Sequence, residues 1–418
     1  MAMSSSPCLS RIPLAAAPAA AAAARPRLWE LDALRGLMLV LMLSTHLPTN
    51  FGIPTSQPLG FVSAAEGFVM LSAYMAGLVY TQRYLRYGLH AMQRAFLKRA
   101  LVVYGCQAAS LLFLFTVIAG LGLTLPQPAV QKLVWFYLQQ PVTAFISSLG
   151  LVYNPPLLDI LPVYVLFMLA SPWVLTYGLR RGWRGILILS GVLWFATQFE
   201  LSRFLYGGVV SMTGLPVPFS ETGAFETYGW QLLWVFGLWL GSLHARVPPE
   251  QRRPMPPAVV VGAAVIAVTF FIWRHIAGLG AFPDGNPLNF LFDKWHLGIL
   301  RLLNFVCLVV LAMHFGSWLK ARLPRMRWLE TMGRASLSVF CAHLVIVLMV
   351  LSIVGEPSPD RPLWQDLLLF GGSVFALYVV ARLVGGNKTR RTATAPGPAP
   401  IVPAVPAAHP PRLNSDAP

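Results

Sequence analysis

Long apolar stretches alternate with short polar segments along most of the chain. Ten of these stretches reach about the 20 residues that an α-helix needs to cross the hydrocarbon core of a bilayer. Apolar runs of this length favour membrane helices over strands. The pattern therefore predicts an all-α integral membrane protein of about ten transmembrane helices. The expected spans are 33–52, 59–82, 100–123, 157–178, 185–207, 229–245, 257–277, 296–318, 333–354 and 364–384.

Basic residues are concentrated in every second loop between these spans, whereas the other loops hold most of the acidic residues. Cytoplasmic loops of membrane proteins carry an excess of Lys and Arg, and this bias sets the orientation. We therefore expect both chain termini on the cytoplasmic side, together with the basic loops. These loops are 83–99, 179–184, 246–256 and 319–332.

The composition excludes an ordinary soluble protein, because 56% of the 418 residues are hydrophobic and only 11% are charged, against about 25% charged in soluble domains. A net charge of +16 would suit nucleic acid, but topology explains its clustering between apolar stretches, so no nucleic-acid partner is expected. The four cysteines are scattered, and the histidines lack metal-ligand spacing. We therefore expect no metal site and no permanently bound cofactor.

The two ends of the chain differ from the part between them. Residues 1–27 and 386–418 are rich in Pro and Ala and carry several Arg residues. Such segments cannot bury enough apolar surface to fold, and Pro18 interrupts the Ala run that could otherwise suggest a signal peptide. We expect two disordered cytoplasmic tails around one membrane domain, residues 28–385.

Arg35 and His46 mark the first span as a candidate site. They are eleven residues apart, so they share one helix face, with a rise of about 16 Å between them. This spacing places an arginine at one membrane surface and a titratable imidazole about halfway across. Polar groups at such depth are costly and usually functional. The alternative is that Arg35 is a topology anchor and His46 a hydrogen-bonded packing residue.

Glu66 lies about one third of the way along the second span. If the first two spans form an antiparallel hairpin, Glu66 and His46 both fall in the outer half of the membrane. A carboxylate bonded to one nitrogen of an imidazole fixes its tautomer and raises the basicity of the other nitrogen. We therefore expect Glu66 to orient His46. The alternative is a structural carboxyl held by hydrogen bonds between helices.

Three further groups could bind ligands. Lys98 and Arg99 precede the third span, where they could bind phosphates or serve only as a basic anchor. Arg301 and Asn304 lie one turn apart in the eighth span and could contact substrate or form a structural network. His343 in the ninth span is a second intramembrane imidazole, either part of a substrate site or a hydrogen-bonding spacer.

Several of these segments together resemble the OpgC family, within the wider acyltransferase type-3 class. The resemblance covers roughly residues 28–385. It includes the class's spacing between Arg35 and His46, and the loop that contains Lys98 and Arg99 is similar to its basic cytosolic motif. The matching segments are Glu30-Leu-Asp-Ala-Leu-Arg-Gly-Leu, Thr45-His-Leu-Pro, Gly60-Phe-Val-Ser-Ala-Ala-Glu-Gly-Phe-Val and Ser336-Leu-Ser-Val-Phe-Cys-Ala-His.

The resemblance implies a bacterial inner-membrane O-acyltransferase that moves succinyl groups from cytosolic succinyl-CoA to osmoregulated periplasmic glucans. In that interpretation His46 is the general base, oriented by Glu66, while Arg35 and the basic loop bind the phosphates of the acyl-CoA. Arg301 is a candidate for the succinyl carboxylate or the developing oxyanion. Two alternatives stay open. One is an acetyltransferase acting on another extracytoplasmic polysaccharide, and the other is a transporter, since polar residues inside a bundle also line substrate pathways.

Overall fold

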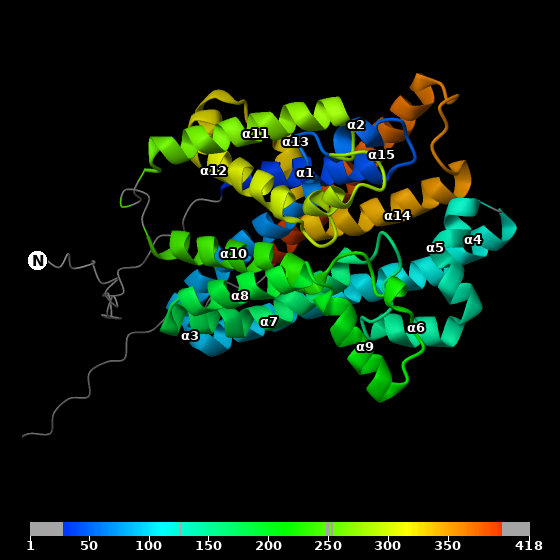
Figure 1. Cartoon of the computed structure of the whole chain (residues 1–418), viewed down its shortest axis with the longest axis horizontal. Coiled ribbons are helices and arrows are strands. Elements are labelled where there is room, and N and C mark those ends of the chain that lie inside the picture. The colour runs from blue at the N-terminus through cyan, green and yellow to red at the C-terminus, as the bar shows by residue number, and fades with distance from the viewer. Residues whose placement is uncertain (1–27, 126, 248–250, 252–253, 395–418) are drawn as a thin grey trace, which may run out of the picture.

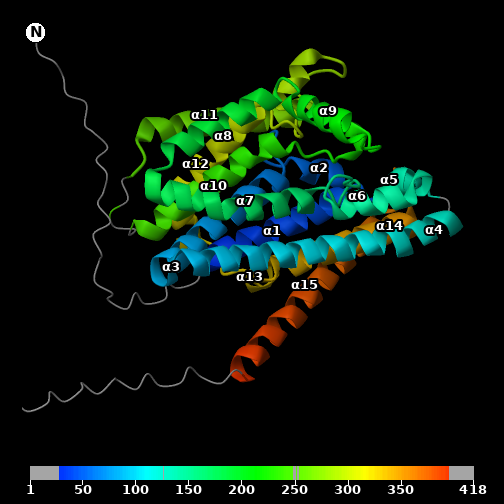
Figure 2. The same ribbon diagram turned by 90° about the horizontal axis from the view of Figure 1, so that it is seen from below.

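The computed structural model describes residues 28–125, 127–247, 251 and 254–394, and every regular element in this part of the chain is a helix. The predicted tail 1–27 lies outside the described residues, as does 395–418. Figures 1 and 2 show the helices running mostly along the long axis of the molecule. They are α1 (Trp29–His46), α2 (Gly52–Ser56), α3 (Ala64–Phe113), α4 (Ala119–Thr124), α5 (Pro128–Gln139), α6 (Pro141–Leu149), α7 (Ile160–Arg181), α8 (Arg184–Thr197), α9 (Leu201–Thr213), α10 (Thr227–Arg246), α11 (Pro257–Ala277), α12 (Ile299–Arg322), α13 (Arg327–Arg334), α14 (Ser336–Val354) and α15 (Leu363–Thr394).

Helix α3 is two antiparallel arms joined at Gly88. A straight helix of its 50 residues would be about 75 Å long, more than twice the hydrocarbon thickness. Gly88 has φ +78°, a left-handed conformation that favours glycine. On either side of it, the rings of Tyr80 and Phe96 stack with centroids 3.8 Å apart, whereas a straight helix would separate these residues by about 24 Å. The arms correspond to the second and third predicted spans.

The fifth predicted span, 185–207, is broken rather than continuous. Helices α8 and α9 meet at an angle of 81°. Between them, Gln198 Nε2 donates to the carbonyl oxygen of His296 at 2.9 Å, and Glu200 has a left-handed backbone, φ +59°. A left-handed residue cannot continue a right-handed helix, so the chain changes direction at Glu200.

In the described part of the chain, six helices are long and apolar enough to cross a bilayer, or seven if the bent pair α8–α9 forms one span. The folded stretch Ala64–Thr124 is a single helix in that count, and α1 is outside it because Glu30, Asp32 and Arg35 lie within its 18 residues. The predicted ten spans and the cytoplasmic termini are therefore not confirmed. Helix α15 continues to Thr394, so the predicted boundary at 386 falls inside a helix.

Glycines permit the closest helix contacts. A Cβ at Gly77 would meet the backbone of Leu238, and a Cβ at Gly241 would meet the backbone of Tyr74. The first arm of α3 and helix α10 therefore touch through their backbones, as small residues allow in membrane bundles. This packing leaves no room for any larger residue at either position.

Segments far apart in the sequence contact each other at both ends of the bundle. At one end, Lys320 Nζ lies 2.8 Å from Glu30 Oε1 and the Arg325 guanidinium is 5.9 Å from the Trp29 ring. At the other end, separate loops bond to each other. There the amide of Asn154 donates to the carbonyl oxygen of Glu221 at 3.0 Å. These contacts join segments that lie far apart in the sequence.

Candidate functional site

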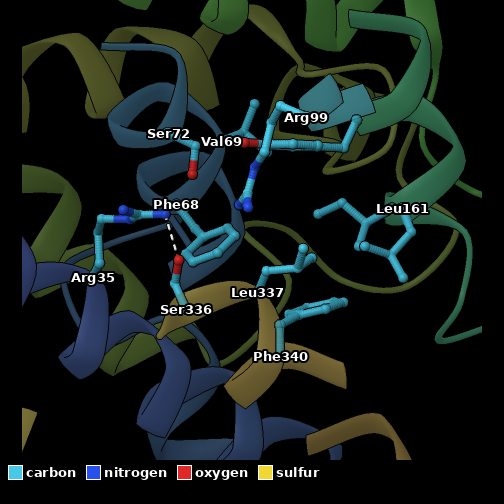
Figure 3. Close-up of a pocket in the computed structure, with 11 residues that line it drawn as sticks. Arg35, Phe68, Val69, Ser72, Arg99, Leu161, Ser336, Leu337 and Phe340 are labelled. Atoms are coloured by element: carbon cyan, nitrogen blue, oxygen red, sulfur yellow. Dashed lines mark hydrogen bonds between the residues drawn. The ribbon is translucent and has the colours of Figure 1, made fainter. Parts of the chain in front are cut away.

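Arg35 is positioned by a close contact between α1 and α13. A Cβ at Gly36 would meet the backbone of Leu329, and one at Gly333 would meet the backbone of Asp32. The two helices can therefore approach until the Arg35 side chain reaches α14, where Nη2 donates to Ser336 Oγ at 2.5 Å. Figure 3 shows this bond.

Ion pairs join α1 to α13 and join α13 to the loop before it. Buried Asp32 lies 3.7 Å from Arg334 Nε, and Glu330 accepts two bonds of 2.8 Å from Arg325. Arg334 also bonds to Glu330. The sequence analysis did not single out Glu330, Arg325 or Arg334, because their pairing depends on how α13 packs. The Glu-Leu-Asp-Ala-Leu-Arg-Gly segment thus has a structural role in addition to carrying Arg35.

A cavity lies beside Arg35, between α1, both arms of α3, α7 and α14. The empty space between these helices is about 400 Å³, a volume that includes open solvent. Figure 3 shows the Arg35 and Arg99 side chains directed into the same space from opposite sides. Lys98 is exposed and is not part of the lining, so the structure brings together Arg35 and Arg99 without Lys98. The rest of the lining is mainly apolar and aromatic.

His46 pairs with His343, which lies on another helix. Nδ1 of His46 is 3.0 Å from Nε2 of His343, and the ring centroids are 5.1 Å apart. His343 is fully buried, whereas His46 is half-buried. His343 is therefore a hydrogen-bond partner of His46, the spacer role that the sequence analysis left open.

Glu66 does not orient His46, so this expectation is wrong. Its Oε1 accepts a 2.5 Å bond from Arg301 Nε, while Oε2 accepts bonds from the amide and hydroxyl of Ser63 at 3.1 and 2.5 Å. The physical reason is that Glu66 is the third residue of α3 and completes a capping box with Ser63. Among the described residues, these bonds involve both oxygens of the carboxylate.

Arg301 bonds to Glu66 in the first turn of α3, and Asn304 contacts the chain just before that helix. Asn304 Oδ1 accepts from the amide of Phe61 at 2.9 Å, and both residues are buried. Arg301 Nη2 and Asn304 Nδ2 are also buried, and neither has a hydrogen-bond partner among the described residues. These two residues are therefore part of a structural network that leaves two donors unsatisfied.

Phe340 connects the cavity to the histidine pair. It lines the cavity, stacks on Phe68 with centroids 6.2 Å apart, and lies 5.5 Å from the ring of His343. The cavity and the histidines are thus neighbours along the bundle, with the basic side chains at one end and His46 about 16 Å further along α1.

The start of α15 holds the turn after His46. Buried Asp366 accepts bonds from Asn50, at 3.0 Å from its amide and 2.9 Å from its side chain. Arg361 donates to the carbonyl oxygen of Pro48 and lies 3.5 Å from Asp366. No local signal in the sequence points to this clamp, because its members are more than 300 residues apart.

A second polar group surrounds His296, just before α12. His296 Nδ1 bonds to Asp293 at 2.9 Å, and its Nε2 is 3.8 Å from both Glu200 and Glu226. The hydrogen bond to Asp293 raises the pKa of His296, and burial raises the pKa of Asp159 to about 6. No group of three or more His, Cys, Asp or Glu in the described part of the chain is arranged to hold a metal ion.

The family model described as OpgC protein matches residues 27–389. Neither the curated proteins nor the solved structures compared with the chain match it. The match spans α1 to α14 and most of α15, and it includes the cavity and both histidines. The chain therefore belongs to the OpgC family.

Proposed function

We propose that this protein is a membrane-bound O-acyltransferase of the bacterial inner membrane. It moves a succinyl group from cytosolic succinyl-CoA to a hydroxyl of an osmoregulated periplasmic glucan. One observation carries the proposal: a cavity with two guanidinium groups adjoins a histidine pair inside an apolar bundle. The family membership supports the same class of enzyme.

The cavity suits the phosphate-bearing part of an acyl-CoA. Guanidinium groups bind phosphate oxygens through paired, charge-assisted hydrogen bonds, and Arg35 and Arg99 are directed into one space (Figure 3). This end of the bundle carries the loops that the charge pattern places in the cytosol. A nucleotide held there leaves the pantetheine arm free to extend along Phe68 and Phe340 toward the histidines.

His46 is the group that we assign as the base. A bond between two neutral imidazoles needs an N–H on one ring and a lone pair on the other. When Nδ1 of His46 donates to Nε2 of His343, Nε2 of His46 carries the lone pair. Since His46 is half-buried while His343 is fully buried, only His46 can meet a substrate. His343 then fixes the tautomer, the role first assigned to Glu66.

The acyl transfer that we propose requires no cofactor. The acceptor oxygen attacks the thioester carbon while His46 takes the hydroxyl proton. The carbon–sulfur bond then breaks, and His46 returns the proton to the departing thiolate, so the products are an ester and free CoA. General-base assistance of this kind contributes about 10²–10⁴-fold to the rate. The acceptor reaches His46 from the end of the bundle opposite the cavity.

The test uses purified protein in lipid nanodiscs with labelled succinyl-CoA and glucan. His46→Ala should lower label transfer about 10²–10⁴-fold while the protein remains folded. His314→Ala is the matched control, because His314 is an exposed histidine of α12 outside the site. Undiminished transfer by His46→Ala would remove His46 from the chemistry. Glucan movement across vesicles without any label transfer would instead indicate the transporter.

A further inference from the structure

Lys294 is a partly buried cation that has no acidic partner among the described residues. It lies between the short helix Pro287–Phe292 and α12, with Nζ 4.5 Å from the ring centroid of Trp295 and 5.8 Å from that of Phe225. Among the described residues, no carboxylate oxygen lies within ion-pair distance of Nζ. Burial accordingly lowers the pKa of Lys294, since removing a charge from water is costly without a counter-ion.

The nearby carboxylates all have other partners. Glu66 is bonded to Arg301 and Ser63. Asp159 accepts from the amide of Ala224 at 3.1 Å. Asp293 is bonded to His296. In the described part of the chain the positive charge of Lys294 is therefore not in an ion pair, and an anion that enters this region would supply the missing partner.

Lys294 is coupled electrostatically to the proposed reaction centre. Its charge interacts with the Glu66–Arg301 pair and Asp159, and with His46 as well. Arg301 contacts the segment that carries Lys294, since its Nη1 donates to the carbonyl oxygen of Phe292 at 3.4 Å, and its buried Nη2 has no hydrogen-bond partner in the described part of the chain. An ammonium and an unsatisfied guanidinium nitrogen therefore belong to the same part of the fold, and both are donors that a carboxylate would satisfy.

We propose that Lys294, assisted by Arg301 Nη2, binds the free carboxylate of a dicarboxylic acyl group and so selects succinyl donors over uncharged ones. This inference rests on the proposed acyl transfer. When the thioester carbon of succinyl-CoA is at His46, a short alkyl bridge extends the carboxylate toward Lys294. An uncharged acyl chain would leave both donors without a partner, and sites built to hydrogen-bond a substrate group reject analogues that lack it.

The experiment compares succinyl-CoA with butyryl-CoA, whose chain has the same length but ends in a methyl group. Lys294→Gln should raise KM for succinyl-CoA about 10- to 100-fold, the effect of losing a charged hydrogen bond. The inhibition constant of butyryl-CoA should stay unchanged. Lys294→Arg keeps the charge and should retain most of the preference. The same substitution at an exposed outer lysine, Lys132→Gln, is the matched control.

Thermal melting of each variant checks folding. If Lys294→Gln does not fold, Lys294→Met keeps the alkyl stem against Trp295 and Phe225 and makes the same comparison. An equal loss of affinity for both thioesters would show a merely structural lysine and overturn the inference. An unchanged KM for succinyl-CoA would also overturn it. Failure of the wild-type protein to transfer any acyl group would instead refute the proposed function, and the inference with it.

Discussion

Replacing Glu66 by alanine tests whether this buried carboxylate is structural. Its side chain is 0% exposed and that of Arg301 is 2% exposed, and their Oε1 and Nε atoms are 2.5 Å apart. Removing one partner of a buried pair leaves an uncompensated charge, which costs about 3–5 kcal/mol. The capping bonds with Ser63 are lost as well. We therefore expect Glu66→Ala to lower the free energy of unfolding by about this amount.

A double-mutant cycle with Arg301 isolates the pair. Arg301→Met alone should also destabilise the protein, since the carboxylate then stays buried without its cation. The double variant Glu66→Ala/Arg301→Met should recover most of the loss, because it leaves no uncompensated charge in the interior. The coupling energy of the cycle should then approach the sum of the two single losses, in the compensating direction.

The assay is unfolding of the detergent-solubilised protein, followed by tryptophan fluorescence as denaturant is added. Glu356→Ala is the control, because Glu356 is exposed and such surface changes stay within about 0.5 kcal/mol. Wild-type stability of Glu66→Ala would refute the reasoning, and so would strictly additive effects of the Glu66 and Arg301 substitutions. A variant that is fully stable yet inactive would restore Glu66 to a catalytic role.

Three further predictions follow from the site. Arg99→Ala should raise KM for acyl-CoA about tenfold, which corresponds to the loss of one charged hydrogen bond. Lys98→Ala should change this KM less than twofold, because Lys98 lies outside the cavity lining. Steady-state kinetics measure both values, and equal effects of the two variants would contradict the cavity assignment. Asp366→Ala removes two hydrogen bonds to Asn50, in the turn after His46. It should lower kcat more than it changes KM, and denaturant titrations should show a stability loss of about 1–3 kcal/mol. An unaltered kcat would show that this contact does not position His46. The bond to Asp293 raises the pKa of His296 above 6.5. The stabilising effect of this bond is therefore complete below the unfolded pKa and is lost as pH rises through the folded pKa. In thermal melts the stability advantage of wild type over His296→Gln should shrink above about pH 6.5, and an advantage that grows there would contradict a raised pKa.

The amino-acid pattern was sufficient for several conclusions. Hydropathy predicted an all-helical membrane protein, and every regular element of the described residues is a helix. The topology expected from the charge alternation stays a prediction. The opening motif indicated the family, which the match over residues 27–389 confirms. These properties depend on local composition or on short segments, so they can be recognised without knowing which helices touch.

Helix geometry alone also placed Arg35 and His46 on one face of α1, because helical periodicity follows from residue spacing. The same approach failed for Glu66. Depth within the membrane suggested His46 as its partner, but the first-turn position made Ser63 a local competitor. Arg301 lies 235 residues further along the chain. The depth of a residue in the membrane limits which side chains it can reach, but it does not decide which of them becomes its partner.

Tertiary packing decided the partners and the cavity. His46 bonds to a histidine 297 residues away, and Arg35 meets Arg99 at one space only because α3 reverses at Gly88 and α13 packs against Gly36. Hydrogen bonds and ion pairs act over a few ångströms, so they depend on which side chains the folded backbone brings into contact. Hydropathy and helical periodicity, by contrast, are properties of each segment by itself and are already present in the unfolded chain.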